Sequence, residues 1–299
     1  MTRSKAKLTA LSRKDHLTFL GFIAPNFILF AVFTFWPLIY SLYLSFMRWN
    51  MISPNKTWVG FENYILLSKD PVFWLAVKNT VYVTAGTVII KLAIALFLAV
   101  LLNQKLAGRL LYRAVIFSPT FTTSVAVAMV WTWIFDPFYG ILRYPIEALG
   151  LVSPNWLGDV NWTVPALIIV SIWQGLGYDM VIFLAGLQSI PKILYEAAEV
   201  DGASKSSSFF NITLPLLSPT TFFLIITSII SSFKTFDLVA VMTQGGPLNS
   251  SNVYIYYLYQ LAFKRFRMGA ASAMSVIFFV VILMITVIQV RISKKWVHY

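Results

Sequence analysis

Six apolar runs, each long enough to cross a lipid bilayer as a helix, constrain this chain more than any other feature of its sequence. About twenty apolar residues are needed to cross the hydrocarbon core as an α-helix. The runs extend over residues 20–44, 77–102, 114–135, 164–187, 216–242 and 270–290. They are continuous rather than alternating, so they predict helices and not the strands of a membrane barrel. We therefore expect an all-α integral membrane protein with six transmembrane helices.

The composition agrees with a place in the bilayer. Of the 299 residues, 59% are hydrophobic and 11% are charged, whereas soluble domains contain about 25% charged residues. Cysteine is absent, and the two histidines, His16 and His298, lie near the termini. A thiol-based or histidine-based metal site is therefore not expected. The net charge of +12 resides between the apolar runs, which is typical of membrane-protein loops rather than of nucleic-acid binding.

The basic residues also predict how the chain is oriented. The N-terminal segment is basic, but the apolar stretch after it is too long for a cleaved signal peptide and lacks a small-residue cleavage site. We expect a retained first helix. Lys and Arg are more frequent in the segments that a cytoplasmic N-terminus would place inside the cell. The prediction is a cytoplasmic segment at residues 1–19, a six-helix transmembrane domain at 20–291 and a cytoplasmic tail at 292–299.

No set of residues in the sequence predicts an enzyme. The phosphate-binding pattern G-x-x-x-x-G-K-[ST] does not occur, and Gly245-Gly246-Pro247 is a turn signal rather than a phosphate loop. A nucleophile with its base, or a set of metal ligands, cannot be assembled. We expect no catalytic residue, no metal site and no cofactor in this chain.

The segment at about residues 188–216, between the fourth and fifth runs, carries the most information. Pro191 favours the first turn of a short helix, and Gly202 supplies the left-handed turn that ends it. A second short helix follows, and Pro215 leads back into the membrane. The first helix has a small apolar face formed by Leu194, Ala197 and Ala198. Such a shape suits a groove on a partner protein, and an amphipathic helix lying in the membrane interface is the alternative.

The residues of this segment resemble the EAA motif of binding-protein-dependent ABC transporter permeases. That motif reads E-A-A-x-x-D-G-A followed by I-x-L-P, and it is matched by Glu196-Ala197-Ala198, Asp201-Gly202-Ala203 and Ile212-Thr213-Leu214-Pro215. The resemblance implies that the loop couples the permease to an ATPase subunit, with Glu196 and Gly202 as the hallmark positions. The run Lys205-Ser206-Ser207-Ser208 replaces an aromatic-polar pair found in many sugar permeases, which leaves the choice of partner open.

Other segments narrow the resemblance to the carbohydrate-uptake branch, close to maltose and sn-glycerol-3-phosphate permeases. They are residues 58–64, 184–191 and 243–247. The resemblance implies the type I ABC importer permease fold in a bacterial plasma membrane and a sugar, oligosaccharide, polyol or glycerol-phosphate solute. It also implies a second homologous permease, two ATPase subunits that bind ATP and Mg, and an extracytoplasmic solute-binding protein. A secondary transporter driven by an ion gradient is the alternative, and it leaves the EAA segment unexplained.

Apart from Lys78 at the very start of its run, four charged residues lie inside the apolar runs, namely Lys91, Asp179, Lys234 and Asp237. Placing such a group in a bilayer costs about 2.5–3.5 kcal/mol, so these residues face protein or water. Lys234 can pair with Asp237 three residues away, and Lys91 can pair with Asp179 across helices. Alternatively, Asp179, Lys234 and Asp237 contact a solute, together with Ser231-Ser232.

A polar patch of small residues interrupts the fourth run at Gln174, Gly175, Gly177 and Tyr178. Small residues allow close packing of membrane helices. Polar groups at this depth also suit a solute path, in which Gln174, Tyr178 and Asp179 would bind hydroxyl groups. Both interpretations stay open on the sequence.

An aromatic segment precedes the sixth run and contains Tyr254, Tyr256, Tyr257, Tyr259 and Phe263. As an amphipathic helix it would lie flat in the membrane interface, or it would offer a docking surface to the solute-binding protein.

Overall fold

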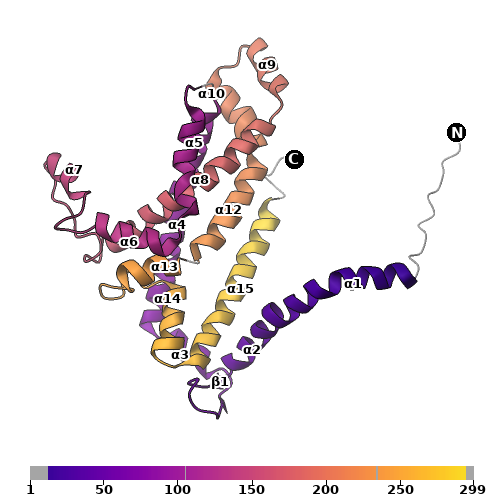
Figure 1. Ribbon diagram of the computed structural model, residues 1–299, viewed down its shortest axis with the longest axis vertical. Coiled ribbons are helices and arrows are strands. Elements are labelled where there is room, and N and C mark those ends of the chain that lie inside the picture. The colour runs from indigo at the N-terminus through magenta and orange to yellow at the C-terminus, as the bar shows by residue number, and fades with distance from the viewer. Residues whose placement is uncertain (1–12, 105, 234, 294–299) are drawn as a thin grey trace.

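The computed structural model describes residues 13–104, 106–233 and 235–293, and it is helical almost throughout (Figure 1). The first half contains α1 (Arg13–Phe30), the π-helical turn η1 (Ala31–Phe35), α2 (Trp36–Ser45), β1 (Met47–Arg48), β2 (Thr57–Trp58), α3 (Glu62–Lys69), α4 (Pro71–Asn103), α5 (Arg109–Phe117), the 3₁₀ turn η2 (Ser118–Phe121), α6 (Ser124–Ile134) and α7 (Arg143–Ala148). The second half contains α8 (Thr163–Ser189), α9 (Lys192–Val200), α10 (Lys205–Ser208), η3 (Phe209–Thr213), α11 (Leu214–Leu216), α12 (Ser218–Phe233), α13 (Phe236–Leu238), η4 (Val239–Thr243), α14 (Tyr254–Tyr259), η5 (Gln260–Lys264) and α15 (Met268–Ser293).

Among the residues that the structure describes, five helical stretches are long and apolar enough to cross a membrane, and a bent pair of helices supplies the sixth if the pair counts as one crossing. The five are Thr18–Ser45, Pro71–Asn103, Thr163–Ser189, Ser218–Thr243 and Met268–Ser293. The all-α membrane architecture expected from the sequence is therefore confirmed.

The third crossing is not the single helix that the apolar run at 114–135 predicts. Its two parts, Arg109–Phe121 and Ser124–Ile134, meet at an angle of 104°. Thr122 is extended, with φ −82° and ψ 137°, and the side chain of Thr123 caps α6 by accepting a hydrogen bond from the backbone N–H of Ala126. A side-chain cap of this kind begins a new helix in a new direction. Hydropathy predicted the crossing but not the bend.

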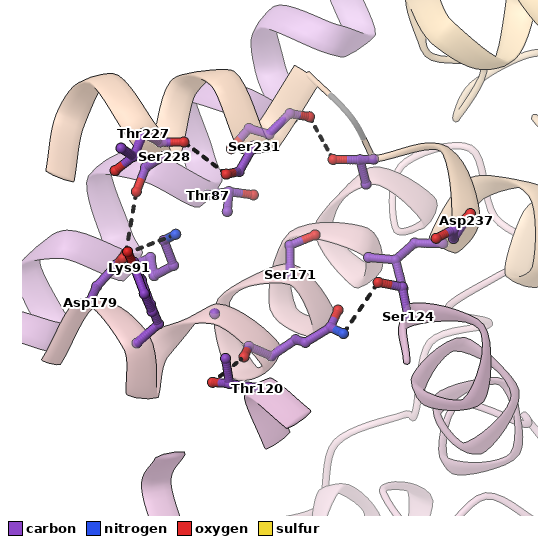
Figure 2. Close-up of a pocket in the computed structure, with 16 residues that line it drawn as sticks. Thr87, Lys91, Thr120, Ser124, Ser171, Asp179, Thr227, Ser228, Ser231 and Asp237 are labelled. Carbon is purple, nitrogen blue, oxygen red and sulfur yellow. Dashed lines mark hydrogen bonds and ion pairs between the residues drawn. The ribbon is translucent and has the colours of Figure 1, made fainter. Parts of the chain in front are cut away.

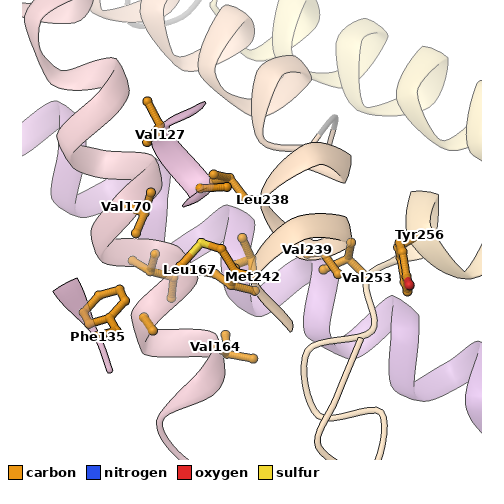
Figure 3. Packing of buried hydrophobic residues seen from close by; sticks show 14 residues of the cluster. Val127, Phe135, Val164, Leu167, Val170, Leu238, Val239, Met242, Val253 and Tyr256 are labelled. Carbon is orange, nitrogen blue, oxygen red and sulfur yellow. The ribbon is translucent and has the colours of Figure 1, made fainter. Parts of the chain in front are cut away.

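The helices α4, α8 and α12 form the centre of the molecule. Helix α4 packs most extensively against α8, and α12 packs against both. Helix α5 also approaches α8 closely at Gly177, where a Cβ atom would lie 2.3 Å from the carbonyl oxygen of Ile116 and 2.5 Å from the Cα of Phe117. Figure 3 shows the neighbouring apolar cluster, in which Leu167 and Val170 of α8 lie near Met242 of η4.

The first crossing lies apart from this centre. In Figure 1 the rod formed by α1, η1 and α2 extends away from the bundle and meets it only near α2, which packs against α15. Only 6% of the residues in its most apolar stretch are buried. A long apolar helix left uncovered in this way needs lipid or another chain beside it.

Three tyrosines of the aromatic segment before α15 are buried in the protein, so for these three the expectation of a face in the membrane interface was wrong. Tyr254, Tyr256 and Tyr257 are 6%, 2% and 0% exposed. The Tyr254 hydroxyl donates a hydrogen bond to the carbonyl oxygen of Met274 at 2.7 Å, and burial raises the pKa of Tyr254. The α14 segment is therefore part of the protein core, where these three tyrosines cannot offer a docking surface either.

Candidate functional site

The EAA segment projects from one end of the molecule, as α9 in Figure 1 shows. Pro191 caps α9 with an extended backbone, and Gly202 follows the helix with φ 77°, as the sequence predicts. A Cβ atom at Gly202 would meet nothing within 4 Å. The positive φ, and not lack of space, is what favours glycine there.

The residues that match the E-A-A-x-x-D-G-A part of the motif are accessible, whereas Thr213 in the I-x-L-P part is buried. Glu196, Ala197, Asp201 and Gly202 are exposed, Ala198 and Ala203 are half-buried, and no residue of α9 is buried. The helix is held to the bundle by Tyr195, whose hydroxyl lies 2.9 Å from the Thr213 hydroxyl. The structure thus presents the motif at the molecular surface, and its role in coupling stays a prediction.

A polar cavity of about 340 Å³ lies between α4, α8 and α12 (Figure 2). The residues that line it are Thr87, Lys91, Thr120, Ser124, Ser171, Gln174, Gly175, Tyr178, Asp179, Thr227, Ser228, Ser231, Ser232, Thr235, Asp237 and Leu238. Most of these side chains carry a hydroxyl, amide or charged group. No group of three or more His, Asp or Glu side chains arranged to hold a metal ion occurs among the described residues.

The cavity brings together residues that the sequence placed on the candidate solute path. Gln174, Tyr178, Asp179 and Asp237 all line it, whereas Lys234 falls outside the described residues, so its pairing with Asp237 is not described either. The two interpretations of the glycine patch, helix packing and solute path, apply to different residues. Gly177 packs against α5, and Gly175 lines the cavity. Contact with a solute stays a prediction for each of these residues.

Lys91 and Asp179 form an ion pair across the cavity wall, as the sequence suggested. The Lys91 Nζ lies 2.8 Å from Asp179 Oδ2, and the two side chains are 9% and 2% exposed. The Ser228 hydroxyl donates a second hydrogen bond to the same oxygen at 3.3 Å. One carboxylate therefore connects α4, α8 and α12, and a buried charge needs such partners.

Gln174 connects α8 to the bend of the third crossing. Its side-chain amide donates to the carbonyl oxygen of Thr122 at 3.2 Å and to the Ser124 hydroxyl at 3.3 Å. The Thr120 hydroxyl donates in turn to the backbone carbonyl of Gln174 at 3.3 Å. The bend thereby brings α6 and η2 residues to the cavity.

Several hydroxyl residues of the cavity escaped the sequence analysis. They are Thr87, Thr120, Ser124, Ser171, Thr227, Ser228 and Thr235. A signal was present in α12, because Thr227 and Ser231 are spaced four apart, as are Ser228 and Ser232. Residues four apart share one face of a helix. The spacing of the hydroxyl residues, and not charge alone, therefore indicates which face of α12 lines the cavity.

Comparisons with known proteins agree with this geometry. The family model described as "Binding-protein-dependent transport system inner membrane component" matches residues 91–298. The chain is 40% identical to "Probable ABC transporter permease protein YesP" of Bacillus subtilis (strain 168) over 96% of this chain and 94% of the relative. It is 33% identical to "sn-glycerol-3-phosphate transport system permease protein UgpA" of Brucella abortus biovar 1 (strain 9-941) over 93% and 94%.

A solved structure is similar over nearly the whole chain. It is a chain of a bacterial ABC transporter involved in the import of the acidic polysaccharide alginate, with a TM-score of 0.82 and 25% identity. The match covers 94% of this chain and 96% of that one. A second structure of the alginate transporter, in complex with a periplasmic protein bound to alginate pentasaccharide, matches equally well, at 25% identity over 94% of this chain and 95% of that one. These matches support an ABC importer permease over a secondary transporter driven by an ion gradient.

Proposed function

Because the chain belongs to the family of binding-protein-dependent transport system inner membrane components, we propose that its central cavity is the site through which a hydroxyl-rich solute passes. The chain is a permease subunit of an ABC importer. The solute class that suits the cavity is a sugar, oligosaccharide, polyol or glycerol phosphate. The observation that supports this assignment is a polar cavity of about 340 Å³ surrounded by membrane-spanning helices.

Polar groups at this depth are costly unless they have a polar partner. The cavity concentrates hydroxyl groups, an amide and an ion pair on three helices that are otherwise apolar. Hydroxyl and amide groups both donate and accept hydrogen bonds, which matches the hydroxyl groups of a sugar or polyol. Gln174, Tyr178, Asp179 and Asp237 are the residues we assign to solute contact, and Lys234 belongs to the same assignment on the sequence alone.

We further propose that α9 docks into a separate ATPase subunit. Its support is the exposed motif of Glu196, Ala197, Ala198, Asp201, Gly202 and Ala203 at one end of the molecule. ATP and Mg would bind to two such subunits, and this chain would supply the coupling surface. Because α9 must then face the cytoplasm, we assign both termini to that side of the plasma membrane.

The uncovered first crossing supports a second, homologous permease as a partner. The rod from Thr18 to Ser45 is apolar but almost unburied within this chain. A neighbouring permease would cover part of it and complete the translocation path. An extracytoplasmic solute-binding protein would deliver the solute, and the similar alginate transporter forms a complex with a periplasmic protein bound to alginate pentasaccharide.

The cavity assignment is tested by substitution of Gln174. The transporter, reconstituted with its partner subunits and binding protein, is assayed for ATP-dependent uptake of maltose, D-glucose, sorbitol and sn-glycerol 3-phosphate. We expect Gln174→Ala to reduce uptake of the transported solute about ten-fold, because it removes the hydrogen bonds of a polar cavity group. Assembly, measured by co-purification, should be unchanged.

The matched control is Ile169→Ala, on the same helix but 38% exposed and outside the cavity. We expect this control to transport normally. If Gln174→Ala transports as well as the control, or fails to co-purify with its partners, the cavity assignment is wrong.

A further inference from the structure

Two threonines of α4 have buried hydroxyl groups that lack a hydrogen-bond partner among the residues that the structure describes. They are Thr84 and Thr87, which are 8% and 4% exposed. A threonine in a helix can bond to the carbonyl four residues back, as Thr80 does with Ala76 at 2.7 Å. Burying a hydroxyl without any partner is unfavourable. The unpartnered, buried hydroxyl of each residue therefore needs a physical explanation.

The two hydroxyl residues face different surroundings. Thr84 lines an apolar groove together with Val88, Leu92 and Phe183. Thr87 lines the polar cavity and lies among its hydroxyl groups in Figure 2, with Ser171 and Ser231 nearby in the view. A polar ligand is therefore available to Thr87 but not to Thr84.

Lys91 lies one helical turn after Thr87, on the same face of α4. An ammonium group has three N–H donors, and the described structure uses one of them, toward Asp179 at 2.8 Å. Gly175 makes room for this side chain, because a Cβ atom there would lie 3.3 Å from Lys91 Nζ. Donor capacity is therefore left over on a group that lines the cavity.

Thr87, Lys91 and Asp179 together form what we call the α4 wall. It combines unused donors with a carboxylate acceptor, and its two charges compensate each other. A neutral ring that carries hydroxyl groups can accept from Lys91 and donate to Asp179 or Thr87. An anionic group at the same place would lie against the Asp179 carboxylate, which is unfavourable at short range.

We propose that the α4 wall determines specificity within the cavity by binding a neutral, hydroxyl-bearing face of the solute. This proposal rests on the proposed function, because it assumes that the cavity admits a solute. It goes beyond the proposed function in two ways. It names the chemical class of the group that the α4 wall selects, and it adds Thr87 and Lys91 to the residues that contact the solute.

The test uses the permease assembled with its partner subunits in nanodiscs, without the binding protein. Binding of D-glucose and maltose, as neutral probes, and of D-glucuronate, as an anionic probe, is measured by saturation-transfer NMR. We expect Thr87→Val to weaken binding of the neutral probes about five-fold, the effect of one lost hydrogen bond. Thr84→Val is the matched control, with the same change on the same helix, and should bind as the wild type does.

The ion pair is tested by the double substitution Lys91→Met/Asp179→Leu. Removing both charges avoids an unpaired buried charge, so the complex should assemble. We expect it to bind the neutral probes at least ten-fold more weakly. If the double variant binds glucose with wild-type affinity, the ion pair has only a structural role and the proposal is overturned.

Three further outcomes would also overturn it. They are equal effects of Thr87→Val and Thr84→Val, tighter binding of glucuronate than of glucose, and absence of binding of both neutral probes to the wild type. The proposed function is judged separately, because Gln174→Ala tests the cavity without involving α4. If Gln174→Ala weakens glucose binding and Thr87→Val does not, the cavity assignment stands and the α4 wall is wrong.

Discussion

Two opposing effects decide whether the ion pair of Lys91 and Asp179 stabilises the protein. Moving two charges out of water costs several kcal/mol for each ion, and their attraction offsets this only with good geometry and further hydrogen bonds. Both conditions hold, with a contact of 2.8 Å and a hydrogen bond from Ser228. Removing one partner alone typically costs about 3–5 kcal/mol. Single substitutions at this pair would therefore report on folding, and only the double substitution reports on solute binding.

Tyr257 connects α14 to the start of α4. Its hydroxyl donates a hydrogen bond to Asp70, whose other carboxylate oxygen caps α4 by accepting from the backbone N–H of Val72 at 2.9 Å. We expect Tyr257→Phe to lower the stability of the purified transporter by about 1–2 kcal/mol through this lost hydrogen bond. Thermal unfolding measures the loss, and uptake below the unfolding temperature should be unchanged.

The same residue predicts a pH dependence. Burial, and then the hydrogen bond to Asp70, raise the pKa of Tyr257 from 10.0 to about 12. A raised folded-state pKa means that the stabilisation is fully present below pH 10 and is lost as the pH rises toward 12. The difference in stability between wild type and Tyr257→Phe should be constant from pH 7 to pH 9 and shrink above pH 10. A difference that already changes between pH 7 and pH 9 would contradict this assignment.

At the scale of elements, α9 makes the coupling prediction testable apart from folding. No residue of α9 is buried, so changes on it should leave the membrane fold intact. We expect Glu196→Lys or Gly202→Asp to abolish solute-stimulated ATP hydrolysis or to weaken recruitment of the ATPase. Aspartate at Gly202 must also adopt φ 77°, which costs about 1–2 kcal/mol for a residue with a Cβ.

The control for α9 is Glu199→Lys, which makes the same charge change on the same helix outside the matched motif. Stimulated ATPase activity and co-purification are measured for all three variants. Normal activity of both Glu196→Lys and Gly202→Asp would refute the coupling role. Equal loss in Glu196→Lys and Glu199→Lys would show that any positive charge on α9 blocks docking, without a special role for Glu196.

How much the sequence predicts differs from element to element. The α9 turn was predictable because its signals, Pro191 and Gly202, are local. The bend between η2 and α6 was not, because mean hydropathy treats a straight helix and a bent pair alike, although Pro119 lies in η2 just before it. The site was half predictable. Charged residues in apolar runs can be identified from the sequence. The hydroxyl of Thr87 can be recognised as part of the site only once the structure shows that it lines the cavity.

At the scale of the whole molecule, the first crossing shows what a single chain cannot supply. Its apolar run predicts a helix, and the structure has one, but only 6% of its most apolar stretch is buried. The sequence of this chain contains no information about the surface that covers it. The same limit applies to α9, because the ATPase subunit that we propose as its partner is not part of this chain.

The orientation of the molecule can be tested with single cysteines, because the chain has none of its own. Figure 1 places α9 and the β1 end at opposite ends of the molecule. Asn55, between β1 and β2, and Asn155 are exposed, as is Ser206 next to the EAA motif. If α9 docks into an ATPase, Ser206 must lie in the cytoplasm and both asparagines outside it.

In intact spheroplasts we therefore expect a membrane-impermeant maleimide to label Asn55→Cys and Asn155→Cys. It should label Ser206→Cys only after the membrane is permeabilised. Ile169→Cys, which faces away from the cavity within a crossing, is the control and should resist labelling in both conditions because thiolate formation is suppressed in hydrocarbon. Labelling of Ser206→Cys from outside would place α9 where it cannot meet a cytoplasmic ATPase, and the orientation and the coupling proposal would fail together.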